Sequence, residues 1–253
     1  MYHPYKKGYS VLPALEKLEE NPFHIDVFYD HYIKEKKKAL KRQKVHLFQE
    51  CDHKILFALE DFVKEYADNV DPPYTLHNVA MQLQEDIAIH RIKDGRDWLA
   101  ATHVCFPSGW RPEQKIGKPL DEIHAPIPGM NLKNGYRIAE ASVKNGPFRR
   151  FVWSPVYERK INFHPDLPKK QFDINNPTIL VKVEKQITWP LPELNAFFFI
   201  LRQYIVEPEL PDLLKACEEM DDNQKRYKGV TNEFISYMRD VVDGNVKDSH
   251  FTC

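Results

Sequence analysis

The sequence predicts an α+β fold in which an antiparallel sheet is flanked by helices. Three observations support this class. Apolar residues recur at helical spacing before residue 71, short alternating segments between residues 86 and 189 predict strands, and helical spacing returns after residue 210. Strands gathered between two runs of helices are typical of an antiparallel sheet with helices packed on it.

Residues 1–73 are expected to form an N-terminal helical extension that packs on the core. A short helix is predicted around Leu12–Glu20. From about Asp30 to Val70, apolar residues recur at helix-compatible spacing and no proline interrupts them. Asp71-Pro72-Pro73 ends this region, because proline fixes φ and removes an amide donor.

A run of basic residues, KEKKKALKRQK, lies inside the predicted helical region from Lys34 to Lys44. One interpretation is a patch for phosphate or for an acidic partner. The other is a solvated helix face, which is the usual role of such charge runs. The sequence leaves both open.

Residues 74–253 are expected to form the core of the fold. Strands are predicted at Asp86–Ile92, Trp98–Phe106, Phe148–Trp153 and Thr178–Trp189. The last alternates most clearly: Val181 and Val183 share one face, while Lys182, Glu184 and Gln186 share the other.

The segment Ala196–Val206 is strongly apolar and is predicted to be a buried helix, with a final strand as the alternative. Two C-terminal helices are predicted after it. One runs from Pro211 to about Lys225, and the other from about Asn232 to Val242, where Gly244 follows as a stop signal.

Composition and motifs exclude several classes of protein. The 253 residues carry a formal net charge of −1, so no strong attraction to nucleic acid or to an anionic membrane is expected. The four cysteines form no CxxC pair. No secretory signal is visible and no apolar run is long enough to span a bilayer, so the cytoplasm is the expected compartment. There is no GxGxxG, P-loop, HExxH or GxSxG motif.

The densest cluster of unusual residues is CFPSGWRPEQKIGKPLDEIHAPIPG, from Cys105 to Gly129. Five prolines stiffen this connection, Trp110 offers a flat apolar face, and Lys115 offers a cation. His124 stands beside a rigid Pro-Ile-Pro. One interpretation is a site for a planar, iron-containing cofactor with carboxylate tails, which needs an apolar wall, cations and an imidazole ligand. The alternative is that His124 is a buried histidine bonded to a backbone carbonyl.

This region resembles the haem-dependent oxidative N-demethylase alpha-subunit-like family from about Gln84 to Glu207. Arg202 and Tyr204 stand where that family has an arginine and an aromatic residue. The sequence departs from the family pattern at three positions: Val152 stands in place of an asparagine, and Lys182 and Lys185 stand in place of arginines. The matching pieces, in order, are Gln84–Ile87, Cys105–Trp110, Lys115–Leu120, Ile123–Pro128, Arg150–Trp153, Val183–Gln186 and Leu191-Pro192.

The resemblance implies a PAS-like antiparallel sheet that encloses haem b. Enzymatic members oxidise a methyl group of a small N-methylated amine with dioxygen and release formaldehyde, using electrons from separate flavin and iron–sulfur subunits. The resemblance therefore implies a monooxygenase subunit. A non-catalytic haem-binding sensor or carrier of the same fold, and a structural partner protein without haem, are the competing functions.

Six residues are the candidates for the site that the resemblance implies. His124 is the candidate axial iron ligand, and Lys115 and Arg150 are candidates to pair with haem propionates. Trp110 and Trp153 are candidates to flank the porphyrin. Glu184 is the candidate catalytic residue, because a carboxylate facing the pocket could bind an ammonium substrate or relay protons, whereas on a solvated face it would be an ordinary strand residue. His90 and His103 are lesser candidates for the iron.

Overall fold

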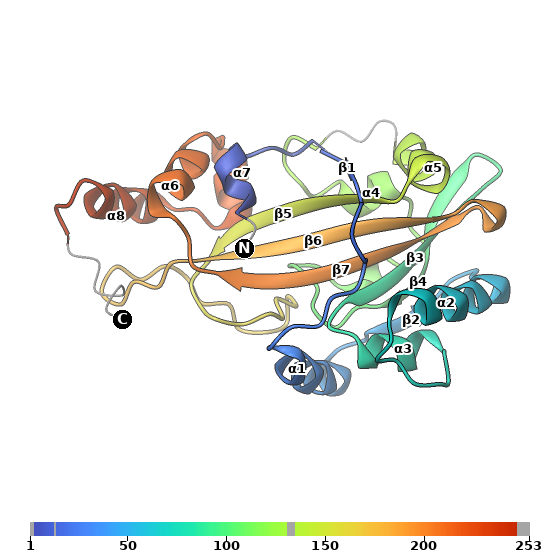
Figure 1. Ribbon diagram of the computed structural model, residues 1–253. Coiled ribbons are helices and arrows are strands. Elements are labelled where there is room, and N and C mark those ends of the chain that lie inside the picture. The colour runs from blue at the N-terminus through green and yellow to red at the C-terminus, as the bar shows by residue number, and fades with distance from the viewer. Residues whose placement is uncertain (1–2, 13, 131–134, 247–253) are drawn as a thin grey trace.

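The computed structural model describes residues 3–12, 14–130 and 135–246, and within them a seven-stranded antiparallel sheet forms the centre of the molecule (Figure 1). The strands lie in the order β1-β5-β6-β7-β3-β4-β2. Helices flank this sheet, so the α+β class is confirmed. The strand bounds are β1 Glu16–Lys17, β2 His46–Phe48, β3 Asp86–Lys93, β4 Arg96–His103, β5 Phe148–Val156, β6 Leu180–Leu191 and β7 Ala196–Val206.

The segment Ala196–Val206 is strand β7, so the prediction of a buried helix was wrong. It pairs with β6 on one side and with β3 on the other, with Ile187 opposite Ile200 in the first ladder. Phe198 packs into a hydrophobic cluster on one face of the sheet, and Phe197 packs into another hydrophobic cluster on the opposite face. Because both faces of a central strand are buried, its sequence is continuously apolar and shows no alternation that would separate it from a helix.

The N-terminal part contains three helices: α1 Tyr29–Arg42, α2 His53–Tyr66 and α3 Leu76–Gln82. The predicted helical region is therefore interrupted, and β2 lies between α1 and α2. Asp52 starts α2, since its side chain accepts a hydrogen bond from the Lys54 amide. The predicted helix at Leu12–Glu20 was wrong, because Glu16 and Lys17 form β1 against β5.

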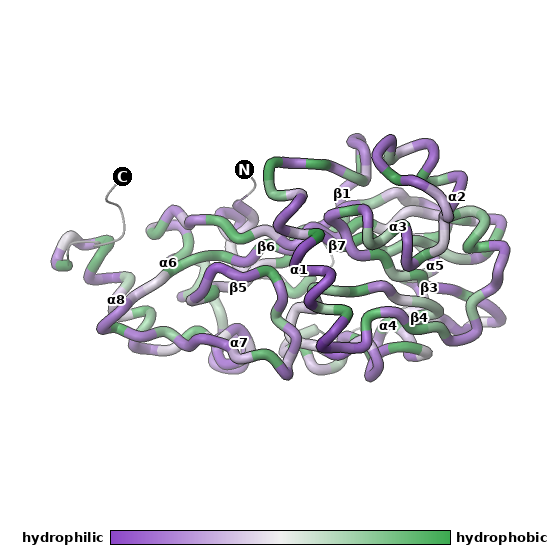
Figure 2. Tube along the Cα trace, turned by 90° about the horizontal axis from the view of Figure 1, so that it is seen from below, coloured by the Kyte–Doolittle hydropathy of each residue, from purple (hydrophilic) through white to green (hydrophobic). Residues whose placement is uncertain are grey.

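Most of the basic run lies on the exposed side of α1, and Figure 2 shows this helix largely in the hydrophilic colour. Lys36 differs from its neighbours, because its side chain is completely buried. Its ammonium donates to the Ala80 carbonyl at 2.8 Å and lies 3.1 Å from a carboxylate oxygen of Asp86. The run thus forms an exposed face, with one internal brace from Lys36 to the start of β3.

One face of the sheet is covered by two groups of helices. Helices α2 and α3 pack over β3, β4, β6 and β7 around Phe62, Ile89 and Phe198. The C-terminal helices α6 Leu210–Glu218 and α8 Asn232–Val242 cover the other end of this face, around Val183 and Phe234. Figure 1 shows the two groups at opposite ends of the long strands.

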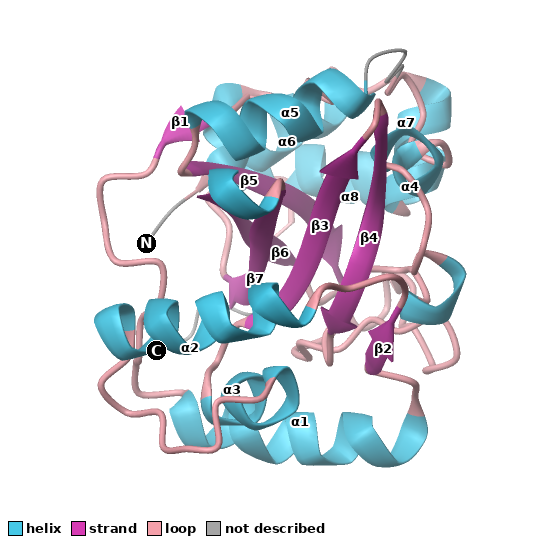
Figure 3. Cartoon of the chain, turned by 90° about the vertical axis from the view of Figure 1, so that its right-hand side faces the viewer, coloured by secondary structure: helices cyan, strands magenta, loops and turns pink. Residues whose placement is uncertain are grey.

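The opposite face carries α4 Leu120–His124 and α5 Gly135–Asn145, which the sequence did not predict. In Figure 3, α5 crosses above the sheet while α2 crosses it lower down. Ala139 and Val143 of α5 pack on Ile92 and Phe197, and Ile123 of α4 belongs to the cluster of β3, β4 and β7 residues next to them. This face holds the site described below.

The C-terminal region was predicted in part. The helix Asn232–Val242 is confirmed with the predicted bounds. The helix predicted from Pro211 to Lys225 is two helices, because Asp221 forms a capping box with Gln224 and starts α7 Asp222–Lys228. Three short 3-10 segments complete the fold: Pro4–Lys7, Pro112–Gln114 and Pro192–Leu194. No helix within the described ranges is long and apolar enough to cross a membrane.

Candidate functional site

A cavity of about 640 Å³ lies on the face of the sheet that carries α4 and α5. Its floor is formed by β3, β5, β6 and β7, its roof by residues 108–130 and α5, and its far end by α7 and the chain around Tyr9. Cavities of roughly 300–1,000 Å³ are typical of small-molecule and cofactor sites. A smaller, more open hollow at the β3–β4 turn contains none of the predicted site residues.

All six predicted site residues line this cavity: Trp110, Lys115, His124, Arg150, Trp153 and Glu184. They come from the proline-rich connection, α4, β5 and β6, so the fold brings together segments that are up to 74 residues apart in the chain. The polar face of β6 points into the cavity, because Lys182, Glu184 and Gln186 all belong to its lining.

His124 is the last residue of α4, and its ring is fixed from one side. Its Nδ1 hydrogen-bonds to the Leu120 carbonyl at 2.7 Å, one helical turn back. Among the described residues no partner is found for Nε2. Burial, with a smaller contribution from the nearby cations Arg150 and Lys115, lowers the pKa of His124 to about 4, although the hydrogen bond to the Leu120 carbonyl acts in the opposite direction. The side chain is therefore a neutral imidazole at pH 7, with Nδ1–H donating and the Nε2 lone pair available.

The wall next to His124 is apolar. Trp110 and Ile123 pack against Leu99, Phe199 and Leu201 in one cluster. Lys115 lies at the edge of this wall and donates to the Ile123 carbonyl at 2.6 Å. Burial lowers the pKa of Lys115, with Lys118 contributing in the same direction. An apolar wall bordered by a cation suits a flat ligand with an anionic edge.

Trp153 borders the cavity, but its ring packs on the other side of β5. It makes edge-on contacts with Tyr5 and Tyr9, with ring centroids 5.9 Å apart in both pairs. Strand alternation explains this placement, because Arg150 and Trp153 are three residues apart and so project from opposite faces of β5. Trp110 is thus the tryptophan that belongs to the apolar wall beside His124.

The floor of the cavity carries buried charges. Glu184 is 6% exposed and accepts hydrogen bonds from Gln186 and from Gln203, the latter at 3.2 Å. Burial raises the pKa of Glu184, while the Gln186 hydrogen bond and the cations Lys182 and Arg150 oppose that rise. A carboxyl group whose pKa is raised by burial is typical of proton-transfer groups in active sites.

Two lysines near Glu184 are less exposed than the sequence predicted, since Lys182 is buried and Lys228 is half-buried. Burial lowers the pKa of Lys182 to about 7 and that of Lys228 to about 8. Lys182 donates to the Ser108 hydroxyl, and its ammonium lies 4.6 Å from the centre of the Phe163 ring. Lys228, at the end of α7, donates to the Trp153 carbonyl at 2.9 Å. Of the described lining residues six are basic and two acidic, so a carboxylate group of a ligand bound in the cavity would find cations near it.

The lesser histidine candidates lie in different places. His90 lines the cavity, stacks on Phe197 with ring centroids 5.2 Å apart, and pairs with Asp97 at 2.7 Å. Its pKa is lowered by burial despite the Asp97 contact. His103 is fully buried outside the cavity, on the opposite side of β4.

Two further residues of the family-like motifs brace the fold. Arg202 forms a buried ion pair with Glu85 at 2.9 Å and a second pair with Asp26 at 2.6 Å. Neither Arg202 nor Glu85 lines the cavity. Glu85 therefore has a structural role, because the two ion pairs tie the N-terminal chain at Asp26 and the start of β3 to β7.

Sequence reasoning missed the contributions of Tyr9, Lys169, Tyr227 and Lys228 to the cavity. Lys228 lies in a short polar helix before Gly229, where a lysine normally faces solvent. Lys228 is half-buried here because its ammonium contacts the Trp153 carbonyl of β5, and no local pattern in the sequence encodes that contact.

The model of one protein family matches residues 60–233, more than two thirds of the chain. Its description is haem-dependent oxidative N-demethylase, alpha subunit-like. The chain belongs to this family. The match begins within α2 and extends to the start of α8, so it includes the whole floor and roof of the cavity. Membership in the haem-dependent oxidative N-demethylase alpha-subunit-like family thus rests on more of the chain than the motifs between Gln84 and Glu207.

Proposed function

We propose that this chain binds haem b in the cavity, that His124 would ligate the iron, and that the chain acts as the haem-carrying subunit of an oxidative N-demethylase. The observation that carries the proposal is the state of His124. A neutral imidazole, whose Nδ1 is fixed to a backbone carbonyl and whose Nε2 is unpartnered in the described structure, has the form of a metal-ligating histidine.

The other lining residues fit the same group. The wall around Trp110, Ile123 and Phe199 is apolar, as the face of a porphyrin requires. Arg150 has no ion-pair partner among the described residues, and burial lowers its pKa. A propionate would supply the anion that this guanidinium lacks, and Lys115 would hold the second one. No CxxCH sequence occurs, so the haem would be held without thioether bonds, as haem b is.

Haem bound here would supply the iron at which dioxygen is activated. The protein's own contribution would be to place a small N-methylated amine, which is cationic at neutral pH, next to Glu184. The Glu184 carboxylate would bind the ammonium, and Gln186 and Gln203 would hold the carboxylate in position by donating to its two oxygens. Because burial raises its pKa, and so makes the carboxylate a stronger base, Glu184 could also accept a proton from the substrate.

The electrons would come from partner proteins. The family description refers to an alpha subunit, and the sequence has neither a dinucleotide fingerprint nor a cysteine cluster for an iron–sulfur centre. A separate flavin and iron–sulfur reductase fits this division of labour.

Haem binding is tested by the optical spectrum of protein expressed with ample haem. The wild-type protein is expected to show a Soret band, and His124→Ala is expected to lose it. His53→Ala is the matched control, because His53 is exposed on α2 and far from the cavity lining. A wild-type protein without Soret absorbance, or a His124→Ala variant with an unchanged band, would refute the assignment.

Catalysis is tested by formaldehyde release from dimethylamine with dioxygen and an artificial reductant. Glu184→Gln is expected to keep the Soret band, because it keeps the size and the polar contacts of the side chain. It should raise KM for the amine, because the neutral amide removes the attraction for an ammonium. A stable Soret band without formaldehyde release would favour the non-catalytic sensor or carrier of the same fold.

A further inference from the structure

Two lysines of the cavity have no role in the proposed binding of haem. Lys182 and Lys228 both belong to its lining, whereas the haem propionates are assigned above to Arg150 and Lys115. In the described part of the chain, neither the Lys182 nor the Lys228 ammonium forms an ion pair with a carboxylate. Both groups are therefore cations of the cavity whose counter-charge is not fixed by a direct contact.

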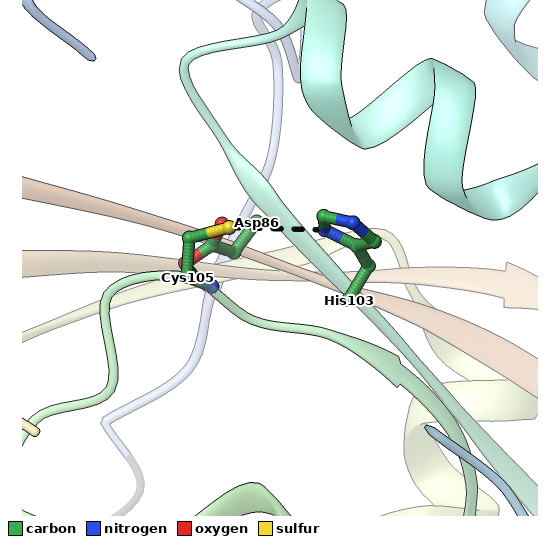
Figure 4. Close-up of side chains that lie close together, drawn as sticks. All are labelled: Asp86, His103 and Cys105. Atoms are coloured by element: carbon green, nitrogen blue, oxygen red, sulfur yellow. Dashed lines mark hydrogen bonds between the residues drawn. The ribbon is translucent and has the colours of Figure 1, made fainter. Parts of the chain in front are cut away.

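Lys36 shows how the protein neutralises a buried lysine elsewhere. Its ammonium lies 3.1 Å from a carboxylate oxygen of Asp86. Figure 4 shows Asp86 beside His103 and Cys105, in a cluster whose members are all buried. Lys36 thus has its anion within the fold. Lys182 and Lys228 have no such ion pair, so a ligand that brings an anion into the cavity would be held by them.

The strand register places the two lysines at neighbouring residues of β5. Lys182 of β6 lies directly opposite Ser154. The Lys228 ammonium donates to the carbonyl of Trp153, the residue before Ser154, at 2.9 Å. Lys182 is 8% exposed, and its ammonium also contacts the Ser108 hydroxyl. The two cations therefore reach the same end of the cavity, one from the floor and one from α7.

Glu184 lies beside these cations, two residues after Lys182 on the same face of β6. Alternate residues of a strand are roughly 6.5–7 Å apart, so a molecule of the size of an amino acid can contact Glu184 and Lys182 together. Val152 of β5 and Gln203 of β7 lie directly opposite Glu184. Val152 lines the cavity and offers apolar surface beside the carboxylate. This part of the floor thus presents an anion, an apolar side chain and a cation in a row.

The charges around Glu184 decide what kind of amine fits the site. Burial lowers the pKa of Lys182 and of Lys228, and Glu184 opposes this change more than any other charge does. An amine whose ammonium pairs with Glu184 takes up the carboxylate that balances these lysines, and the lysines repel it. A carboxylate in the same ligand would pair with the lysines and remove this repulsion. A zwitterion therefore complements the floor better than a simple amine does.

We propose that the substrate is an N-methylated amino acid, whose ammonium binds Glu184 and whose carboxylate binds Lys182 and Lys228. This inference rests on the proposed function, since it names the substrate class of the same cavity. In the reaction, dioxygen, two electrons from the reductase and two protons are consumed as the N–CH3 group is oxidised. The bond between nitrogen and the methyl carbon breaks, one oxygen atom leaves in formaldehyde and the other in water, and the nitrogen of the product carries a hydrogen in place of the methyl group.

The test is isothermal titration calorimetry at pH 7 on the haem-loaded full chain, with the Soret band recorded on the same sample. The probes are N,N-dimethylglycine and N,N-dimethylglycinamide, which keeps the shape and the ammonium but has no carboxylate charge. The wild-type protein should bind dimethylglycine roughly 10–100-fold more tightly than the amide, because hydrogen bonds to charged groups contribute about that factor.

Lys182→Met and Lys228→Met should each reduce this preference roughly 10-fold. Neither variant should weaken binding of the amide, because each removes a cation that repels it. A merely structural role of the lysines would instead weaken binding of both probes alike. Lys225→Met is the matched control, since Lys225 lies on the same helix as Lys228 but does not line the cavity, and this variant should keep the full preference.

Equal affinities for the two probes in wild-type protein that shows a Soret band would overturn this inference and leave the haem assignment standing. The inference is equally overturned if Lys182→Met and Lys228→Met both keep the wild-type preference. Loss of the Soret band in either variant would also overturn it, because the lysines would then hold the haem propionates. Absence of the Soret band in the wild-type protein would overturn both the haem assignment and this inference.

Discussion

Replacement of Lys182 by methionine should change how the stability of the haem-free protein depends on pH. The folded protein holds this lysine with a pKa lowered to about 7, because burial disfavours its charged form. In the unfolded chain its pKa is about 10.4. Between these values the unfolded state binds one more proton than the folded state, so the wild-type protein gains stability as pH rises and loses it as pH falls toward 7.

The size of the effect follows from the proton difference. One proton corresponds to about 1.36 kcal/mol per pH unit, so the Lys182 contribution between about pH 7.5 and 9.5 is about 2.7 kcal/mol. Lys182→Met should lack this contribution, because methionine has no proton to exchange. The free energy of unfolding by urea, measured at both pH values, should therefore rise less in the variant than in the wild type by roughly 2–3 kcal/mol.

The matched control is Lys170→Met, which removes an exposed lysine from the surface and should keep the wild-type slope. If the free energy of unfolding rises with pH as steeply in Lys182→Met as in the wild type, then Lys182 has the same pKa in the folded and unfolded states. That result would refute the assignment of a desolvated lysine to the floor of the cavity.

Three further variants test the packing by urea unfolding at pH 7. Lys36→Met leaves the buried Asp86 carboxylate without its ion-pair partner and should lower the free energy of unfolding by about 3–5 kcal/mol. The control Lys37→Met replaces an exposed lysine and should change that free energy by less than about 0.5 kcal/mol. Equal effects of the two variants would contradict a buried ion pair at Lys36. Phe198→Ala removes a fully buried ring between β7 and α2 and should cost about 3–5 kcal/mol, a cost that an exposed ring would not show. Thr231→Ala removes the side-chain cap on the Phe234 amide at the start of α8 and should cost about 1 kcal/mol, and no change would mean that this cap is dispensable.

Strand β6 shows how much of the site the sequence could predict. Its alternation placed Val181 and Val183 on one face and Lys182 and Glu184 on the other, as the structure has them. The alternation could not tell whether the polar face meets solvent or a cavity. That depends on α4, α5 and the proline-rich connection, whose position is set by tertiary packing.

The elements that were predicted wrongly share a physical cause. β7 is covered on both faces, so the alternation that marks a half-buried strand is absent. β1 and β2 have two and three residues, too few for any periodicity, and they form only because an edge of the sheet is available. The burial of Lys36 and the partial burial of Lys228 are likewise decided by distant segments, because local charge patterns describe a helix surface and not what packs on it.

The place of β7 in the sheet has a consequence for how the protein is made. β3 with β4 and β5 with β6 can pair as each leaves the ribosome, but β7 is the only strand that connects these two pairs among the described residues. It is also the last of the strands that the structure describes. During synthesis the inner edges of these two strand pairs, β3 and β6, therefore stay unpaired until residues 196–206 emerge from the ribosome. The floor of the cavity is complete only after β7 has inserted between them.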